Sequence, residues 1–163
     1  MIDLIKSFFS SSKPVDKEPF LGWDSVDTVL VIFDQNEDDV MALVNEWKSE
    51  GKKVDVIRWI TPKPKDKKPI ENGFSERDIR FGKFKDPSFA KRWHIQVFVD
   101  CTVQSHKRLK KLLNKQVWQF SAGLNDAHAE NYDLFIPSKG SFALRLNTLR
   151  TYLNLINKQK ARI

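Results

Sequence analysis

Hydrophobic residues follow two different spacings along the chain. Short runs in which nearly every residue is apolar predict strands that are buried on both faces, as in a parallel sheet. Stretches whose apolar residues recur three and four positions apart predict amphipathic helices that cover such a sheet. The runs predict strands at residues 28–33, 53–60, 95–99, 116–120 and 132–136, and the helical spacing predicts helices at residues 36–50, 105–114 and 141–157.

Each predicted helix has one apolar side that would face the sheet. The inward positions are Val40, Leu43, Val44 and Trp47 in the first helix, Leu109, Leu112 and Leu113 in the second, and Phe142, Leu146, Leu149, Leu153 and Ile156 in the third. Gly51 follows the first helix, as is common for a residue that tolerates positive φ. The alternation of strands and helices predicts an α/β fold, a three-layer Rossmann-like or flavodoxin-like open sheet of about five mostly parallel strands.

The start of the chain differs from the rest. Residues 1–24 are expected to form a short amphipathic helical arm and a linker, and residues 25–163 a single α/β domain. We expect the arm, residues 2–9, to pack on its own domain, with a partner chain or a membrane surface as the alternatives. Asp3 and Lys6 interrupt the first apolar residues, so no signal peptide is predicted and a cytoplasmic protein is expected.

Charge narrows the range of partners. The 163 residues carry a net charge of +7, and the pI is about 9.5. This excess favours anionic partners such as nucleic acid, phosphorylated ligands or an acidic membrane, although it also serves solubility. The single cysteine, Cys101, excludes an internal disulfide and a multi-cysteine zinc site.

Two aspartates stand at the carboxyl ends of predicted strands. Asp34 follows residues 28–33, and Asp100 follows residues 95–99. Open α/β sheets bind ligands beyond the carboxyl ends of the strands, where the strand order reverses. If the two strands are neighbours at that point, Asp34 and Asp100 converge and are candidates for holding Mg²⁺ or for catalysis. The alternative is structural, with Asn36 capping the next helix and Asp34 binding backbone amides.

Known phosphate chemistries match this segment only in part. A phosphatase of the haloacid dehalogenase type needs a second aspartate where this chain has Asn36. A dinucleotide site needs glycines in the first turn, and DQNEDD has none. Four polar residues each follow a predicted strand: Asp34, Asp100, Ser121 and Lys139. Response-regulator receiver domains place their acids, hydroxyl and lysine in comparable positions. That arrangement would hold Mg²⁺ and a phosphoryl group, but the acidic pair of a receiver domain is absent here.

Other candidates are a thiol and two basic segments. Cys101 is a possible nucleophile, and a small buried residue is the alternative. Lys107, Arg108, Lys110 and Lys111 surround the leucines of the second helix and are candidate anion-binding residues, as is Lys139. Residues 80–93 mix aromatic and basic side chains, a pattern that suits single-stranded nucleic acid but also an ordinary core.

The whole pattern also resembles a known group of proteins. The segments concerned are VLVIFD, EGKKVDVIRWI, GFSERDIRFGKFKDP, VFVDCT, YDLFIP and LNLINK. Over roughly residues 26–157 the chain resembles a family of small bacterial proteins of unknown function, each a single α/β domain behind a short arm. The resemblance implies a fold and no activity. VFVDCT is also similar to sheet strands of sugar-transferring enzymes, which need two Rossmann-like domains where this chain has room for one.

These observations favour a non-catalytic cytoplasmic binding protein with an anionic or protein partner. The alternative is a Mg²⁺-dependent phosphoryl-transfer enzyme or phospho-switch that uses Asp34 and Asp100. No cofactor is predicted, except Mg²⁺ under that alternative.

Overall fold

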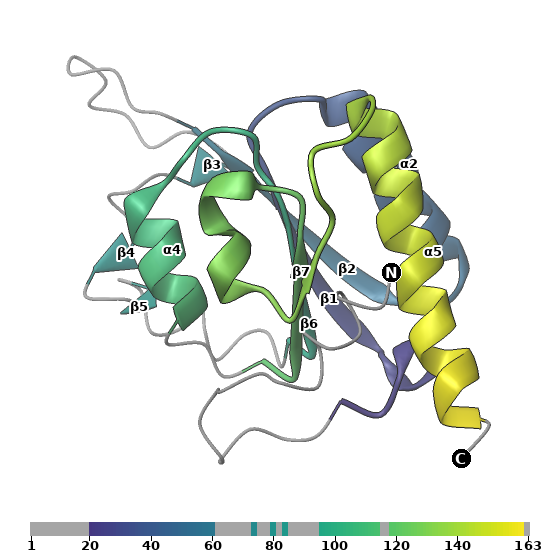
Figure 1. Ribbon diagram of the computed structural model, residues 1–163. Coiled ribbons are helices and arrows are strands. Elements are labelled where there is room, and N and C mark those ends of the chain that lie inside the picture. Colours follow the sequence, from purple (N-terminus) through teal and green to yellow (C-terminus); the bar gives the residue numbers. More distant parts are fainter. Residues whose placement is uncertain are drawn as a thin grey trace.

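The computed structural model describes residues 20–60, 73–74, 79–80, 83–84, 95–114 and 118–161. In this part of the chain a parallel sheet lies between two layers of helices (Figure 1). The predicted three-layer α/β fold is therefore confirmed. The predictions for the arm at residues 2–9 and for the aromatic and basic segment at 80–93 fall wholly or largely outside the described residues.

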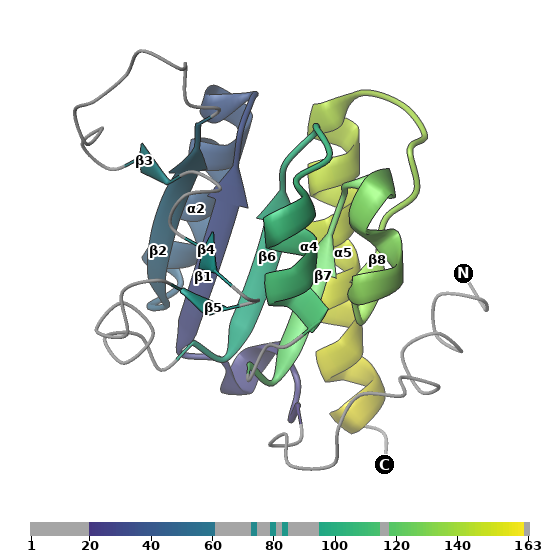
Figure 2. The ribbon, with the colours of Figure 1, turned by 90° about the vertical axis from the view of Figure 1, so that its left-hand side faces the viewer.

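The main sheet has six strands, and every neighbouring pair is parallel. The strands are β1 (Thr28–Phe33), β2 (Lys53–Trp59), β3 (Gly73–Phe74), β6 (Val97–Cys101), β7 (Phe120–Gly123) and β8 (Leu134–Phe135). Their order is β3-β2-β1-β6-β7-β8 (Figure 2). The strand order thus reverses between β1 and β6, so the condition under which Asp34 and Asp100 would converge is met.

Helices cover both faces of this sheet. On one face lie α2 (Glu37–Ser49), α5 (Phe142–Ala161) and the short 3₁₀ helix η1 (Trp23–Ser25) (Figure 1). On the other face lie α4 (Lys107–Asn114) and the 3₁₀ helix η3 (Asp126–Asn131), and α4 also contacts the small antiparallel hairpin of β4 (Ile79–Arg80) and β5 (Lys83–Phe84). Among the described residues, no helix has the length and hydropathy needed to cross a membrane.

The alternation of side chains along the strands produces a separate core on each face. On the α2 and α5 side the strands contribute residues such as Val31 and Val99, against which Trp47 and Leu149 are buried. On the α4 side they contribute residues such as Phe98, which stacks on Trp118 at a ring-centroid distance of 4.4 Å. The inward positions predicted for the helices are buried or half-buried wherever the structure describes their side chains.

Two strands begin and end later than predicted. β7 covers Phe120–Gly123 rather than residues 116–120, because Phe120 pairs with Val97 and the small residues after it continue the ladder. The strand β6 extends to Cys101, so Asp100 lies within the strand and pairs with Ile32 rather than following its end. Strand propensity favours large apolar side chains, but burial in the middle of the sheet overrides it here.

The start of α2 also differs from prediction. Asn36 is the residue before α2, but it adopts a left-handed conformation with φ of 59° and its side chain makes no capping hydrogen bond. Asparagine tolerates this region better than most residues. Two residues before position 25 pack on the sheet, since Trp23 is buried and Phe20 stacks on Phe120 at 4.4 Å.

Candidate functional site

The carboxyl ends of β1 and β6 carry a connected set of polar side chains. Asp100 lies opposite Ile32 in the parallel register, and Asp34 follows Ile32 by two positions. Side chains two apart on a strand point to the same face, so both aspartates belong to the α4 side of the sheet. The structure therefore places both aspartates at one edge of the sheet, at the point of strand reversal, which the sequence left open.

Asp100 is completely buried, and both of its carboxylate oxygens are engaged. Oδ1 accepts hydrogen bonds from the backbone amide of Thr102 at 2.9 Å and from its hydroxyl at 2.5 Å. Oδ2 accepts hydrogen bonds from Nδ1 of His128 at 2.8 Å and from the hydroxyl of Tyr132 at 2.5 Å. A buried carboxylate requires such donors, and four of them satisfy this one.

The tautomer of His128 follows from its two partners. Its Nε2 lies 3.0 Å from the backbone N–H of His106, which can only donate, so Nε2 must be the acceptor. The ring proton is then on Nδ1 and is donated to Asp100. With both nitrogens engaged and no exposed surface, His128 is a structural member of this network rather than a base open to a substrate.

Asp34 connects the end of β1 to the loop after β6. Its Oδ1 accepts from the amide of Val103 at 2.8 Å, and its Oδ2 accepts from the amide of Gln104 and from Nε2 of His106, both at 3.0 Å. Burial alone would raise the pKa of Asp34, but the hydrogen bonds from His106 and from the two amides, together with the His106 charge, lower it below the usual value. The expectation that Asp34 binds nearby backbone amides is confirmed.

Tyr132 is held in place by its hydrogen bond to Asp100 and by its contact with Gly123 in β7. Burial, followed by the nearby charge of Asp100 and the hydrogen bond to it, raises the pKa of Tyr132 well above its usual value. Its ring lies directly over Gly123, where a Cβ atom would stand only 2.1 Å from the Tyr132 Cζ atom. Tyr132 therefore remains a neutral phenol whose hydroxyl is committed to Asp100.

Three other predicted site residues lie away from these carboxylates. Cys101 faces the opposite core and is fully buried, and burial followed by the charges of Asp100 and Asp34 raises its thiol pKa far above the usual range. The Ser121 hydroxyl lies within β7, near Asp133 and the carbonyl of Asn131. Lys139 is exposed in the connection between β8 and α5. These positions do not assemble a receiver-like site around Asp100.

The arrangement has little capacity for metal or nucleophilic chemistry. Both aspartates already accept hydrogen bonds on each oxygen. Within the described ranges, no group of three or more His, Cys, Asp or Glu side chains is placed to hold a metal ion. A protonated, inaccessible Cys101 is not a nucleophile.

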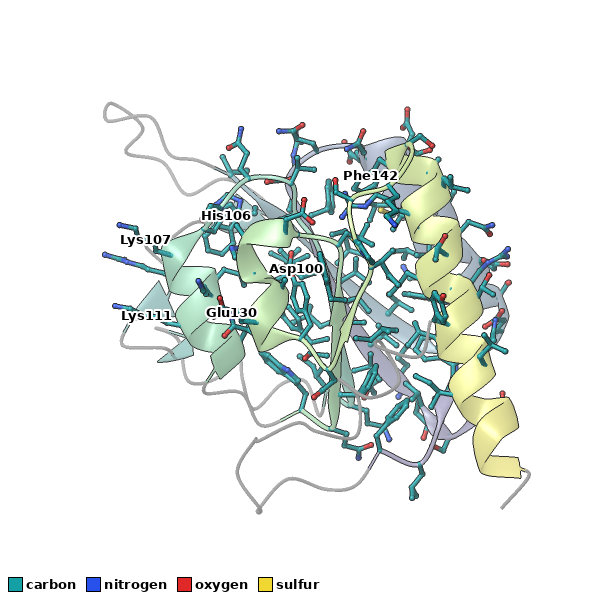
Figure 3. The ribbon with its side chains drawn as sticks, viewed as in Figure 1. Asp100, His106, Lys107, Lys111, Glu130 and Phe142 are labelled. Carbon is teal, nitrogen blue, oxygen red and sulfur yellow. The ribbon has the colours of Figure 1, made fainter. Side chains whose placement is uncertain are left out.

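The predicted basic residues form the outer surface of α4. Lys107, Arg108 and Lys111 are exposed and Lys110 is half-buried, while Leu109 on the other side of the helix is fully buried. Figure 3 shows Lys107 and Lys111 extending from α4 away from the sheet, with Asp100 inside the molecule. The first turn of this helix contains no acidic residue.

Several residues of the polar network are not predicted from sequence. They are Thr102, His106, Asn125, His128 and Tyr132. The one local signal is the DCT tripeptide, since an aspartate often accepts a hydrogen bond from the amide two residues later. The other partners are brought together by the fold alone.

Comparison with known proteins identifies no relative of this chain. No family model, no curated protein and no solved structure matches the chain. Membership in the family of small bacterial α/β proteins stays a prediction.

Proposed function

We propose that this protein is a non-catalytic binding protein that engages an anionic partner through α4. The surface concerned, termed the basic face, consists of Lys107, Arg108, Lys110 and Lys111. Leu109, on the opposite side of the same helix, is buried in the core, so the helix is held with its cations facing outward. A fixed row of cations favours a partner with several negative charges.

The charges of the basic face oppose the stability of the helix that carries them. Lys107 lies in the first turn, where the helix dipole favours acidic residues, and this turn contains none. Lys107 and Lys111 are four residues apart and repel one another. Each effect costs roughly a few tenths of a kcal/mol, and the position of Lys111 in the last turn, where the dipole favours a cation, offsets part of this cost. A bound anion would reverse each of these terms, and this observation carries the proposal.

The carboxylates at the ends of β1 and β6 support a protein without catalytic activity. Asp100 accepts four hydrogen bonds and Asp34 accepts three, so a Mg²⁺ ion would have to displace donors that hold the fold together. The alternative, a Mg²⁺-dependent phosphoryl-transfer enzyme or phospho-switch, requires that exchange. A thermal-shift titration separates the two, since a ligand that binds only the folded state raises the melting temperature. Stabilisation of the wild type by Mg²⁺ that is lost in Asp34→Asn and Asp100→Asn would favour the alternative.

A cytoplasmic location is part of the same proposal. The one cysteine, Cys101, is a free and buried thiol. Reduced thiols without disulfides suit a reducing compartment. Fractionation of cells that produce the protein would test this directly.

Salt-dependent binding to labelled polyanions tests the basic face. Fluorescence anisotropy with polyglutamate and with oligo-dT should show binding that weakens as salt is added. Lys107→Glu/Lys111→Glu should weaken it by more than about tenfold, because two attractive contacts become repulsive. The matched control is Lys48→Glu/Lys53→Glu, which changes two exposed lysines elsewhere by the same charge. Equal losses in both variants would show that only net charge matters and would refute the proposed surface.

A further inference from the structure

The loop between β6 and α4 is held in one shape by buried side chains from other parts of the fold. The backbone amides of Val103 and Gln104 donate to Asp34, and the amide of His106 donates to His128. The carbonyl of Gln104 accepts a hydrogen bond from Nδ2 of Asn125 at 2.7 Å. Side chains that follow β1 and β7 therefore fix the backbone of a surface loop in the connection after β6.

Asn125 ties the loop to the Asp100 network as well. Its Nδ2 also donates to the hydroxyl of Thr102 at 2.8 Å, and Thr102 in turn donates to Asp100. The Oδ1 of Asn125 accepts from the amide of Ala127, which fixes the orientation of its own side chain. Fully satisfied buried networks of this kind make a backbone rigid.

What this rigid backbone displays is uncharged and partly apolar. Val103, Gln104 and Ser105 are exposed, and 46% of the Val103 surface is accessible to solvent. After His106, which packs on Trp59 at a ring-centroid distance of 5.0 Å, the chain enters α4 at Lys107. An aliphatic side chain is thus held a few residues before the first cation of the basic face. We call Val103, Gln104 and Ser105 the loop tip.

We infer that the anionic partner is an acidic polypeptide segment that carries an aliphatic side chain, and that it docks on the loop tip together with the basic face. This inference rests on the proposed function and names the class of partner. The large hydrophobic residues exposed in the described part of the chain are Leu21, Val103 and Leu144, and none is aromatic. An aliphatic side chain beside several cations is complementary to an acidic peptide that carries an aliphatic side chain.

The rigidity of the loop tip supports binding rather than only folding. A loop that is already ordered does not lose its conformational freedom when a partner arrives, so more of the contact energy appears as affinity. Asp34, whose side chain is 7% exposed, holds the loop tip from beneath and is a positioning residue. Its role can be separated from charge, because removing a negative charge near a basic face should by itself strengthen binding of an anion.

Three labelled probes test the inference by fluorescence anisotropy. They are a short peptide of glutamate and leucine, the same peptide with serine in place of leucine, and an oligo-dT of similar length. Wild-type protein should bind the leucine-containing peptide most tightly. Val103→Ser should weaken that binding about threefold, since roughly half of a valine side chain is available to bury, and should leave the serine peptide unchanged. Leu144→Ser, on α5, is the matched control and should change neither.

Asp34→Asn supplies the second arm. A preorganised loop predicts weaker binding of the leucine-containing peptide, whereas an effect of charge alone predicts tighter binding. Because Val103→Ser alters only an exposed side chain, it keeps the test valid if Asp34→Asn fails to fold. The inference would be overturned if the two peptides bound equally and Val103→Ser had no effect, or if oligo-dT bound more tightly than either peptide. The proposed function would still be upheld in that case if Lys107→Glu/Lys111→Glu weakened binding. Absence of binding to every probe would overturn both.

Discussion

Replacing Gly123 by alanine tests whether close packing against β7 holds Tyr132 in place. The new Cβ would lie 2.1, 2.4 and 2.5 Å from the Cζ, Cε2 and Cε1 atoms of the Tyr132 ring, so the ring must shift. Tyr132 is only 6% exposed, and its hydroxyl donates to Asp100 at 2.5 Å. Overpacking of this kind costs about 1–3 kcal/mol, and loss of a hydrogen bond to a charged group about 1.5–3 kcal/mol. The expected loss in the free energy of unfolding is therefore about 3–5 kcal/mol.

Urea unfolding measures this loss, and a second variant isolates its cause. With a slope of about 2 kcal/mol per molar urea, the midpoint of Gly123→Ala should fall by about 2 M at an unchanged slope. Tyr132→Ala removes the ring and costs about 3–5 kcal/mol through the cavity it leaves. In that background Gly123→Ala should cost less than about 1 kcal/mol, since nothing remains to clash with. Additive losses in the double variant would refute the close-packing explanation.

Three further outcomes follow from the same network. In urea unfolding, Asp100→Asn should lower the free energy of unfolding by about 3–5 kcal/mol, because the new amide NH₂ group would face two hydrogen-bond donors and accept from neither. Asp34→Asn should lower it by about 1–3 kcal/mol. A larger loss for Asp34→Asn than for Asp100→Asn would contradict the central role given to Asp100. Burial acts to raise the pKa of Asp34, but its hydrogen bonds bring it below 3.8. Its stabilising effect should therefore be complete above about pH 4 and decline as the pH falls through the lowered value, a decline that Asp34→Asn should lack. Cys101, buried and with a raised pKa, should react with a thiol reagent only as fast as the protein unfolds, and a rapid reaction in the native state would count against the fold.

The sequence was sufficient to predict the layers and the central strands. Residues 29–33 are apolar throughout, which is typical of a strand buried on both faces. The spacing of Val40, Leu43, Val44 and Trp47 specified the inward side of α2, and each of these residues is buried. These features depend on local periodicity, which is visible in any stretch of about ten residues. The two-residue strand β3 lacks enough positions to show a period.

The site was predictable only in its first step. A rule about parallel sheets placed Asp34 and Asp100 at one edge, and that rule needs no side-chain detail. Whether Asp100 would face a ligand or accept structural hydrogen bonds depends on His128 and Tyr132, which lie more than twenty residues beyond it in the sequence. No local spacing announces these partners, because the folding of the connections after β6 and β7 brings them together. The sequence shows His106 and His128 as possible hydrogen-bond donors, but it does not indicate that their acceptors are Asp34 and Asp100.

The same geometry explains why a binding function suits the loop tip better than the strand ends. In a doubly wound sheet the reversal of strand order separates two loops and leaves a crevice for a ligand. In this protein the loop after β6 crosses toward β1 and bonds to Asp34, while His106 is buried against Trp59. The carboxylates that would have lined a crevice thus hold the loop that covers them. Under the proposed function, recognition would use what that loop presents outward, namely Val103 and the cations of α4 that follow it.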